Sequence, residues 1–476
     1  TCYKLVGSKE KAIHGILIVI RDYKERIEWM GNSSIIEKLR TEKGVNDKDQ
    51  DWEQASYQFG CAAARREALR RLQEIEEWLF ENYPKSWHVE GSRHRTLITR
   101  FGEITVKRRL YKDERGVSHF LLDEYLGWLP GQLATPSLQE SIVDLCAQVT
   151  FRPSNRIIEN LTAGVLSTPT VYRLVEKTAE RALEQEEEDW QAVFARGEIP
   201  LGAKKVLTLF SEGDGTWIHL QQEEETQYEI KDGIAYEGWG KLSGKEERYA
   251  LVNKRVYCQG NERIPFWEGA SLEWSRVWDF SSIKEMVIGG DGASWIDEGT
   301  RLFPGAIRQL DGFHLARACG RGWQEGSAIY AAIRAGKAEE ADSIISQAIL
   351  KEGRGAAQSR RYVEHNVAQG QDWRRQSERE GRGLGTMEAN QDKLICNRMK
   401  KKGLSWKKAG ALRMAKILQL RANGEIGRCC KRRQPDAREV SGKMKGRPSK
   451  SNRPQEWLEA GLPALVGPHA NRPWVR

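Results

Sequence analysis

Three short apolar segments of the chain each run into an aspartate, and this pattern is the strongest constraint on the fold. The segments and their aspartates are residues 206–212 with Asp214, residues 286–288 with Asp291, and residues 306–310 with Asp311. A stretch with helical character, residues 293–303, separates the last two segments. Strand, helix and strand in this order predict a partly parallel α/β sheet with acidic residues at the strand ends.

Glycines stand on both sides of Asp214 and of Asp291. Because glycine has no side chain, we expect these positions to leave room for a phosphate backbone. Residues 206–212 and 216–221 are predicted as successive strands that are interrupted at Asp214. Asp and Gly are also ordinary turn residues, so a pair of tight turns is the structural alternative.

Carboxylates gathered at one sheet edge need a cation. Two unit charges about 4 Å apart repel by about 4 kcal/mol at an effective dielectric constant of about 20. Oxygen ligands favour Mg²⁺ or Mn²⁺, and two such ions about 3.5 to 4 Å apart can promote the cleavage of a phosphodiester. Glu388 follows a glycine-rich break and opens a predicted helix, so it is the third candidate ligand, with Asp392 as its nearest competitor. A glutamate in the first helical turn is also what the helix dipole alone would favour.

His314 lies three residues after Asp311, so both side chains can face the same side if a helix begins at the strand end. We expect His314 to orient DNA or the site rather than to act as the nucleophile. A satisfied structural histidine is the alternative interpretation.

Basic residues in three places are candidates for DNA binding. Residues 95–128 alternate as strands with one apolar and one basic face, and three helical patterns at residues 137–149, 154–161 and 170–192 have the spacing of a helix-turn-helix. A third set lies on a basic helical segment that runs from Met387 to Leu420. The candidates are Lys107 and Arg109 on the ribbon, Thr170, Tyr172, Arg173 and Lys177 on the third helix, and Arg398 and Lys400. A solvated sheet face and a plain helical packing unit are the alternatives.

The length of 476 residues predicts several units. They are an N-terminal extension expected to be poorly ordered (1–50), an amphipathic helix with an antiparallel β unit (51–135), the helix-turn-helix unit (136–197), the first part of the core (200–320), a helical insertion (321–385), the last part of the core with Glu388 (386–427), and a basic tail (428–476). The net charge of +9 favours a polyanionic partner such as DNA. We identify no membrane span and no signal peptide, so we expect a cytoplasmic protein that joins the nucleoid when it is bound to DNA.

Four stretches together resemble an ISLre-type insertion-sequence transposase, a family long filed as uncharacterised proteins and related to the Mutator-like DDE transposases. The stretches are residues 212–217, 288–296, 310–314 and the segment from Glu388 to Lys400. The resemblance implies an RNase H-like mixed sheet, interrupted by an all-helical insertion and preceded by the β-ribbon and helix-turn-helix units. It also implies that Asp214, Asp291 and Glu388 are the catalytic, metal-binding triad, with Asp311 and His314 as an accessory motif.

The function that this resemblance implies is the transposition of a bacterial insertion sequence. The enzyme would bind the terminal inverted repeats of the element and catalyse Mg²⁺-dependent cleavage and strand transfer into target DNA. Since two element ends must be paired, we expect a homodimer or a higher oligomer on DNA. A non-catalytic DNA-binding protein derived from a transposase, and an RNase H-like nuclease without strand transfer, are the alternatives.

Overall fold

The computed structural model describes residues 52–163, 166–198, 202–242, 248–303, 305–377, 381–401 and 403–431. The predictions for residues 1–50 and for most of the basic tail therefore lie outside the described residues. The chain divides into one unit up to Arg70 and a second from Arg71 onward, and the helix α3 (Trp52–Asn82) contributes residues to both. Among the described residues, every helix is too short or too polar to traverse a lipid bilayer.

A small antiparallel sheet and three helices precede the main sheet. The small sheet consists of β1 (His88–Thr99), β2 (Gly102–Lys112) and β3 (Ser118–His119), and the short helix α4 (Leu121–Tyr125) follows. The three helices are α5 (Pro136–Gln148), α6 (Phe151–Leu161) and α7 (Thr168–Trp190). Ser167 caps α7 by accepting a hydrogen bond from the backbone N–H of Thr170. The antiparallel unit and the helical trio predicted from the sequence are therefore confirmed as structures.

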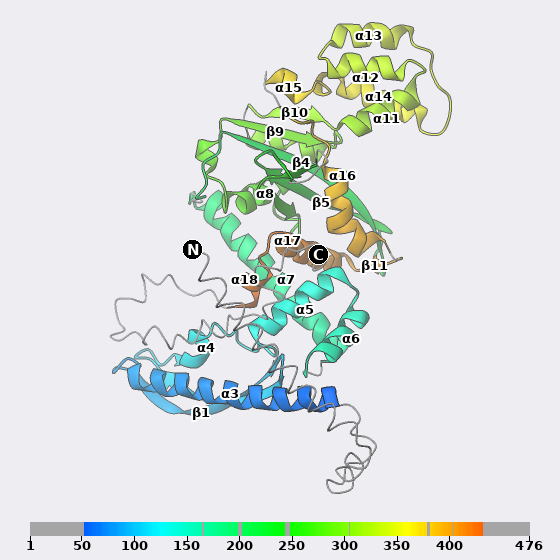
Figure 1. Ribbon diagram of the computed structural model, residues 1–476. Coiled ribbons are helices and arrows are strands. Elements are labelled where there is room, and N and C mark those ends of the chain that lie inside the picture. Colours follow the sequence, from blue (N-terminus) through cyan, green and yellow to red (C-terminus); the bar gives the residue numbers. More distant parts are fainter. Residues whose placement is uncertain are drawn as a thin grey trace, which may run out of the picture. The chain divides into compact units, whose positions relative to one another are not determined.

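The main sheet is mixed, with the long strand β4 at its centre (Figure 1). Its strands are β4 (Thr208–Leu220), β5 (Gln227–Tyr236), β8 (Arg255–Cys258), β9 (Glu285–Gly290), β10 (Ile307–Leu310) and β11 (Ser405–Trp406), in the order β10-β9-β4-β5-β8 with β11 on the far end of β4. The strands β4, β5 and β8 are antiparallel neighbours, whereas β9 and β10 run parallel to β4. A partly parallel sheet was the expectation from the sequence, and it is confirmed. A separate hairpin pairs β6 (Trp239–Lys241) with β7 (Tyr249–Leu251).

Alternating side chains of the main sheet enter two different cores. Leu209 and Ile288 join the core that contains α8 (Phe266–Ser275) and α9 (Ser294–Asp297). Their chain neighbours Phe210 and Val287 join the core on the opposite face. Both faces of the sheet are therefore covered, as the continuously apolar strand at 286–288 requires.

The segment around Asp214 differs from its prediction. Strand β4 continues from Thr208 to Leu220 without a turn, so the prediction of two strands interrupted at Asp214 is wrong. The cause is the partner strand β5, which stays paired with β4 from Phe210 to His219. Asp214 thus lies in the middle of a strand, at the level where β9 ends.

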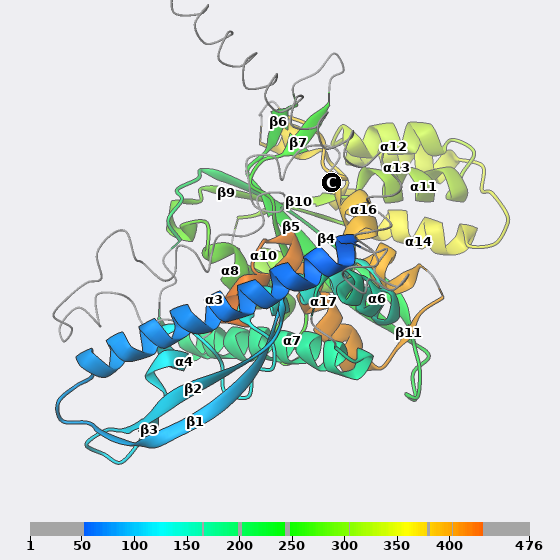
Figure 2. The same ribbon diagram turned by 60° about the horizontal axis from the view of Figure 1, so that its bottom comes forward.

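Helices fill the chain between β10 and the last part of the core, as predicted. They are α11 (Gly312–Gly322), α12 (Gly326–Arg334), α13 (Ala338–Gln347), α14 (Ala356–Asn366) and α15 (Trp373–Gln376), with α10 (Gly299–Leu302) placed before β10. Figure 2 shows α11 to α14 gathered in one cluster. Their shared core includes Leu310 of β10, so the cluster packs onto the edge of the sheet.

The last described part of the core is not one helical segment. It contains α16 (Met387–Gln391), a π-helical continuation η5 (Asp392–Lys400), the strand β11, α17 (Lys408–Ala422) and α18 (Ile426–Cys430). The continuous helix predicted from Met387 to Leu420 is therefore wrong, because residues 405 and 406 pair with β4.

Candidate functional site

The strand register brings three aspartates to one level of the sheet. Gly213 of β4 pairs with Gly290 of β9, and Leu310 of β10 pairs with the same Gly290. The next residue on each strand is Asp214, Asp291 or Asp311, and the N–H of Asp311 donates to the carbonyl of Gly290 (2.7 Å). The acidic cluster, defined as Asp214, Asp291 and Asp311, thus forms where β9 and β10 end.

Asp214 is the member of the acidic cluster with the most perturbed carboxyl group. Burial raises its pKa to about 6, and the nearby carboxylates of Asp291 and Asp311 act in the same direction. The backbone N–H of Gly215 and the ring of His314 oppose that rise. Burial and the neighbouring carboxylates therefore disfavour the ionised form of Asp214 in this site.

Asp311 and His314 form a joined pair at the start of α11. The Asp311 carboxylate accepts hydrogen bonds from the backbone N–H and from the ring Nδ1 of His314, both at 2.9 Å. The hydrogen bond to Asp311 raises the pKa of His314, and Asp214 and Asp291 add to the effect. Burial alone would raise the pKa of Asp311, but its bonds with His314 lower it. Asp311 thus caps α11, and its bond with His314 favours the protonated form of that ring beside the other two aspartates.

Glu388 lies on α16 and its side chain is exposed. The segment before α16 passes close to the strand ends. A Cβ atom placed on Gly385 of this segment would lie 3.2 Å from the carboxylate of Asp311. A Cβ atom placed on Gly289 of β9 would lie 2.9 Å from Leu384 of the same segment. The chain that carries Glu388 is therefore held against the acidic cluster. The described side chains do not, however, bring Glu388 together with Asp214 and Asp291 as a ready metal-binding group.

Glu212 holds the beginning of α16 in place, although the sequence patterns did not single it out. Its buried carboxylate accepts hydrogen bonds from the backbone N–H groups of Gly385, Thr386 and Met387, at 2.8, 2.8 and 3.2 Å. The hydroxyls of Thr386 and Tyr236 each donate a further bond at 2.7 Å. The available signal was a glutamate two positions after Phe210, on the face of β4 that also carries Asp214.

Asp232 is a second acid that sequence reasoning missed. It pairs across the antiparallel register with Asp214 and is fully buried, which raises its pKa well above the ordinary value. One oxygen accepts a bond from Gln391 at the end of α16 (3.2 Å). The other, Oδ2, has no hydrogen-bond partner among the described residues.

The glycines beside the aspartates have a packing role. A Cβ on Gly213 would approach the Trp295 ring to 3.3 Å, and one on Gly290 would approach Ile296 to 2.6 Å. Gly292 has a φ of +94°, a conformation that disfavours other residues. The expectation that these glycines leave room for a phosphate is therefore wrong at Gly213 and Gly290, because side chains of α9 fill the space beside them.

The donors of this site fit a hard divalent cation in chemistry and charge. Carboxylate oxygens are the ligands that Mg²⁺ and Mn²⁺ prefer, and a cation would favour the ionised form of Asp214, whose pKa is raised mainly by burial and further by the neighbouring carboxylates. The unpartnered Oδ2 of Asp232 lies on the strand beside it. Within the described ranges, no three His, Cys, Asp or Glu side chains converge closely enough to hold an ion.

The ribbon residues proposed for DNA binding differ in their surroundings. Lys107 is exposed on β2, as its alternation predicts. Arg109 forms an ion pair with Glu77 (2.8 Å), lies 3.7 Å from Glu76, and stacks over the ring of Phe80. Its prediction as part of an exposed basic face is wrong, because α3 supplies acidic partners for it.

The third helix of the trio presents its predicted residues near its N-terminus. Tyr172, Arg173 and Lys177 are exposed on α7, and Thr170 is half-buried at the cap. The ring of Tyr172 packs edge-on against Phe151 of α6. These side chains lie in the first turns of α7.

The two basic residues of η5 also differ. Lys400 is exposed. Arg398 is buried, donates to the carbonyl of Cys146 (2.8 Å), and lies over the rings of Phe151 and Trp406. Arg398 therefore joins η5 to α5 and α6 and is not available to DNA, which corrects its prediction.

Comparison with known proteins gives one family. The model of an uncharacterised protein family, UPF0236, matches residues 61–434. A UPF0236 protein from the vanSb 3′ region of Streptococcus gallolyticus is 25% identical over 74% of this chain and 78% of its own length. A UPF0236 protein of Caldanaerobacter subterraneus subsp. tengcongensis is 23% identical over 75% of each chain, and its name joins eleven gene labels.

Proposed function

Because this chain belongs to the uncharacterised protein family UPF0236, we propose a function for it from its own residues: a DDE transposase of an insertion sequence that cleaves and joins DNA. The observation that carries the proposal is the acidic cluster, together with Glu212, which holds the start of α16, the helix that carries Glu388, on the same sheet. Acids at the ends of neighbouring strands are costly to the fold, and a phosphodiester-cleaving metal site gives them a use.

The order of the strands supports an RNase H-like core. A meander of β4, β5 and β8 is followed by β9 and β10, which add in parallel on the other side of β4. The helices from α11 to α15 then stand as the helical insertion between β10 and the segment of Glu388. The name of the Caldanaerobacter relative supports a mobile element, since eleven gene labels for one protein suit a sequence that copies itself.

Each residue of the site has an assigned task. Asp214, Asp291 and Glu388 would hold Mg²⁺ or Mn²⁺, and Asp311 and His314 would orient the DNA at the strand ends. A bound ion would supply the positive charge that a phosphodiester needs for attack by an oxygen nucleophile. The exposed ring of Phe313, between Asp311 and His314, can stack against a base. The exposed residues of α7 and Lys107 would bind the element ends.

The test uses DNA that carries the inverted repeats flanking the coding region. We expect the full chain to cleave the repeat ends with Mg²⁺ and to join a precleaved 3′ end to target DNA. Asp214→Asn, Asp291→Asn and Glu388→Gln should abolish both steps and retain DNA binding. Glu339→Gln, which changes an exposed acid on α13, is the matched control. Full activity in any of the three variants contradicts the triad.

A non-catalytic DNA-binding protein is the second candidate. It is favoured by the fact that no three described metal-ligand side chains converge in the structure. DNA binding without cleavage in either metal would support this candidate. Cleavage without joining would instead indicate a nuclease of the same fold.

A further inference from the structure

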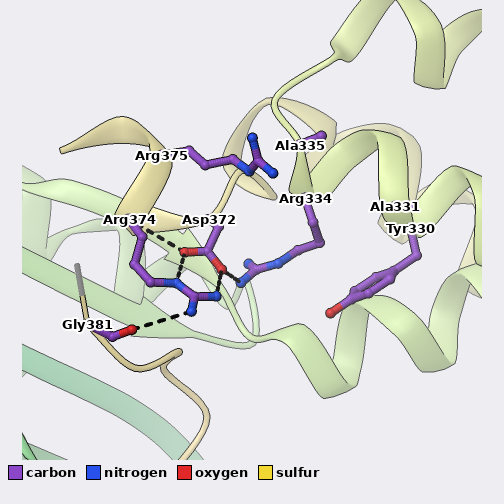
Figure 3. A pocket seen from close by; sticks show the side chains of 8 residues that line it. All are labelled: Tyr330, Ala331, Arg334, Ala335, Asp372, Arg374, Arg375 and Gly381. Carbon is purple, nitrogen blue, oxygen red and sulfur yellow. Dashed lines mark hydrogen bonds and ion pairs between the residues drawn. The ribbon is translucent and has the colours of Figure 1, made fainter. Parts of the chain in front are cut away.

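A hollow of about 880 Å³ lies within the helical segment, between α12 and α15 (Figure 3). Among the described residues, its walls include Arg334, Arg374 and Arg375 and one acid, Asp372. Tyr330 adds an aromatic ring to the same wall. The described lining therefore carries an excess of two positive charges, which favours an anionic occupant.

Asp372 fixes two of the arginines in place. Its carboxylate accepts a bond from Arg334 at 2.5 Å and two bonds from Arg374 at 2.8 Å each, as the dashed lines in Figure 3 show. Burial alone would raise the pKa of Asp372, but these bonds lower it to about 2. One carboxylate cannot neutralise two guanidinium groups. Arg375 is exposed and has no side-chain partner among the described residues, so its charge adds to the excess.

Two contacts join the walls of the hollow to the chain on either side of Asp311. The hydroxyl of Tyr330 lies 3.3 Å from the position that a Cβ would occupy on Gly312, the residue after Asp311. The backbone N–H of Trp373, in α15, donates to the side chain of Gln309 on β10 (2.8 Å). The arginines are therefore anchored to the strand whose end carries Asp311.

We propose that this hollow, named here the arginine pocket, binds the phosphodiester backbone of DNA beside the acidic cluster. A guanidinium group can bind two phosphate oxygens through paired N–H groups. A guanidinium group that Asp372 already holds in place loses less conformational entropy when it binds. The volume suits a short piece of backbone. This inference rests on the proposed function, because it assumes that the acidic cluster acts on DNA.

The test measures the binding of a short fluorescein-labelled DNA duplex by anisotropy, with the full chain and without divalent metal. Arg375→Gln should weaken binding by roughly tenfold and reduce the slope of log affinity against log salt by about 1. Arg334→Gln should act in the same direction. Arg361→Gln, an exposed arginine of α14 outside the pocket, is the matched control and should bind as the wild type does. Thermal unfolding of each variant separates lost binding from lost folding.

The outcomes separate this inference from the proposed function. If the wild type binds and cleaves DNA but Arg375→Gln binds like Arg361→Gln, the arginine pocket is not a DNA site, and the transposase proposal stands. If the wild type does not bind DNA at all, the proposed function fails first. If inorganic phosphate or a mononucleotide binds the pocket and DNA does not, the ligand is a small phosphorylated molecule, which overturns the inference.

Discussion

The carboxylate of Glu212 on β4 binds Thr386 twice, through its backbone N–H (2.8 Å) and its hydroxyl (2.7 Å). These two residues join the centre of the sheet to the first turn of α16, two positions before Glu388. The carboxylate also receives the N–H groups on both sides of Thr386. A negative charge at this position stabilises the N-terminus of the helix as well as its place on the sheet.

Replacing Glu212 with glutamine should destabilise the fold and loosen α16. The amide keeps the shape but loses the charge, and its NH₂ group would face donors. We expect a loss of about 2 to 4 kcal/mol in the free energy of unfolding, measured by urea denaturation. Glu388→Gln, an exposed change on the same helix, should stay within about 0.5 kcal/mol of the wild type. Equal stability of the two variants would show that the bonds of Glu212 carry no energy.

Asp214 should make the metal-free protein less stable as the pH rises. Its folded pKa of about 6 lies above the unfolded value, so the folded state binds more protons between the two values and loses stability through that range. Asp214→Asn should remove this trend and stabilise the metal-free protein by about 1 to 2 kcal/mol at neutral pH. Thermal unfolding across pH measures the effect. A variant with an unchanged pH profile would contradict it.

Mg²⁺ should reverse the effect of Asp214 on stability, because a bound cation favours the ionised carboxylate. We expect the melting temperature of the wild type to rise with added Mg²⁺ near pH 8, where the carboxylate is ionised, and to change less near pH 5, where protons compete. Asp214→Asn should respond less at either pH. If added Mg²⁺ leaves the melting temperature of the wild type and the variant unchanged, the result would argue against an ion at this site.

His314 should stabilise the protein most at low pH. Its folded pKa is raised by Asp311, so its contribution is complete below the unfolded value of about 6.5 and is lost as the pH rises through the folded value. His314→Ala should therefore cost more stability near pH 5.5 than near pH 9. Unfolding experiments at both pH values test this. The control is His365→Ala, which changes an exposed side chain on α14. A larger cost at the higher pH would contradict the pairing.

Arg398 should prove to be a structural residue. Arg398→Gln removes a buried charge that bonds the carbonyl of Cys146, and should cost roughly 1 to 3 kcal/mol of stability. Lys400→Gln, an exposed change on the same segment, should cost less than about 0.5 kcal/mol. Urea denaturation compares the two. A folded Arg398→Gln protein of full stability with weakened DNA binding would restore its prediction as a DNA contact.

The sequence predicts those elements of this fold whose signals are local. The cap at Ser167 and the proline after it set the start of α7, and the apolar run at Val287 identifies β9 because both faces of that strand are covered. Asp214 shows the limit of this reasoning. Glycines on either side indicate a turn, but antiparallel pairing with the next strand, β5, keeps the chain extended through Asp214.

The candidate site was predictable in part for the same reason. Asp291 and Asp311 follow apolar strands directly, so parallel pairing places them together. The sequence patterns predict Arg109 and Arg398 as exposed cations. Their partners, Glu77 and the carbonyl of Cys146, lie far along the chain and cannot be recognised from the sequence. Glu212 was missed because the backbone N–H groups that it binds, at the start of α16, lie more than 170 positions further along the chain.

The long separation between Glu212 and Thr386 also sets an order of events during synthesis. The ribosome delivers β4, β9 and β10 well before the segment around α16, so a nascent chain can assemble the sheet while Glu212 still lacks the N–H groups that satisfy it. Contacts of such long range form late and slow the folding of a domain. Completion of the α16 segment therefore acts as the final closure of the core, and a ribosome that stalls before it leaves a sheet with an uncapped buried charge.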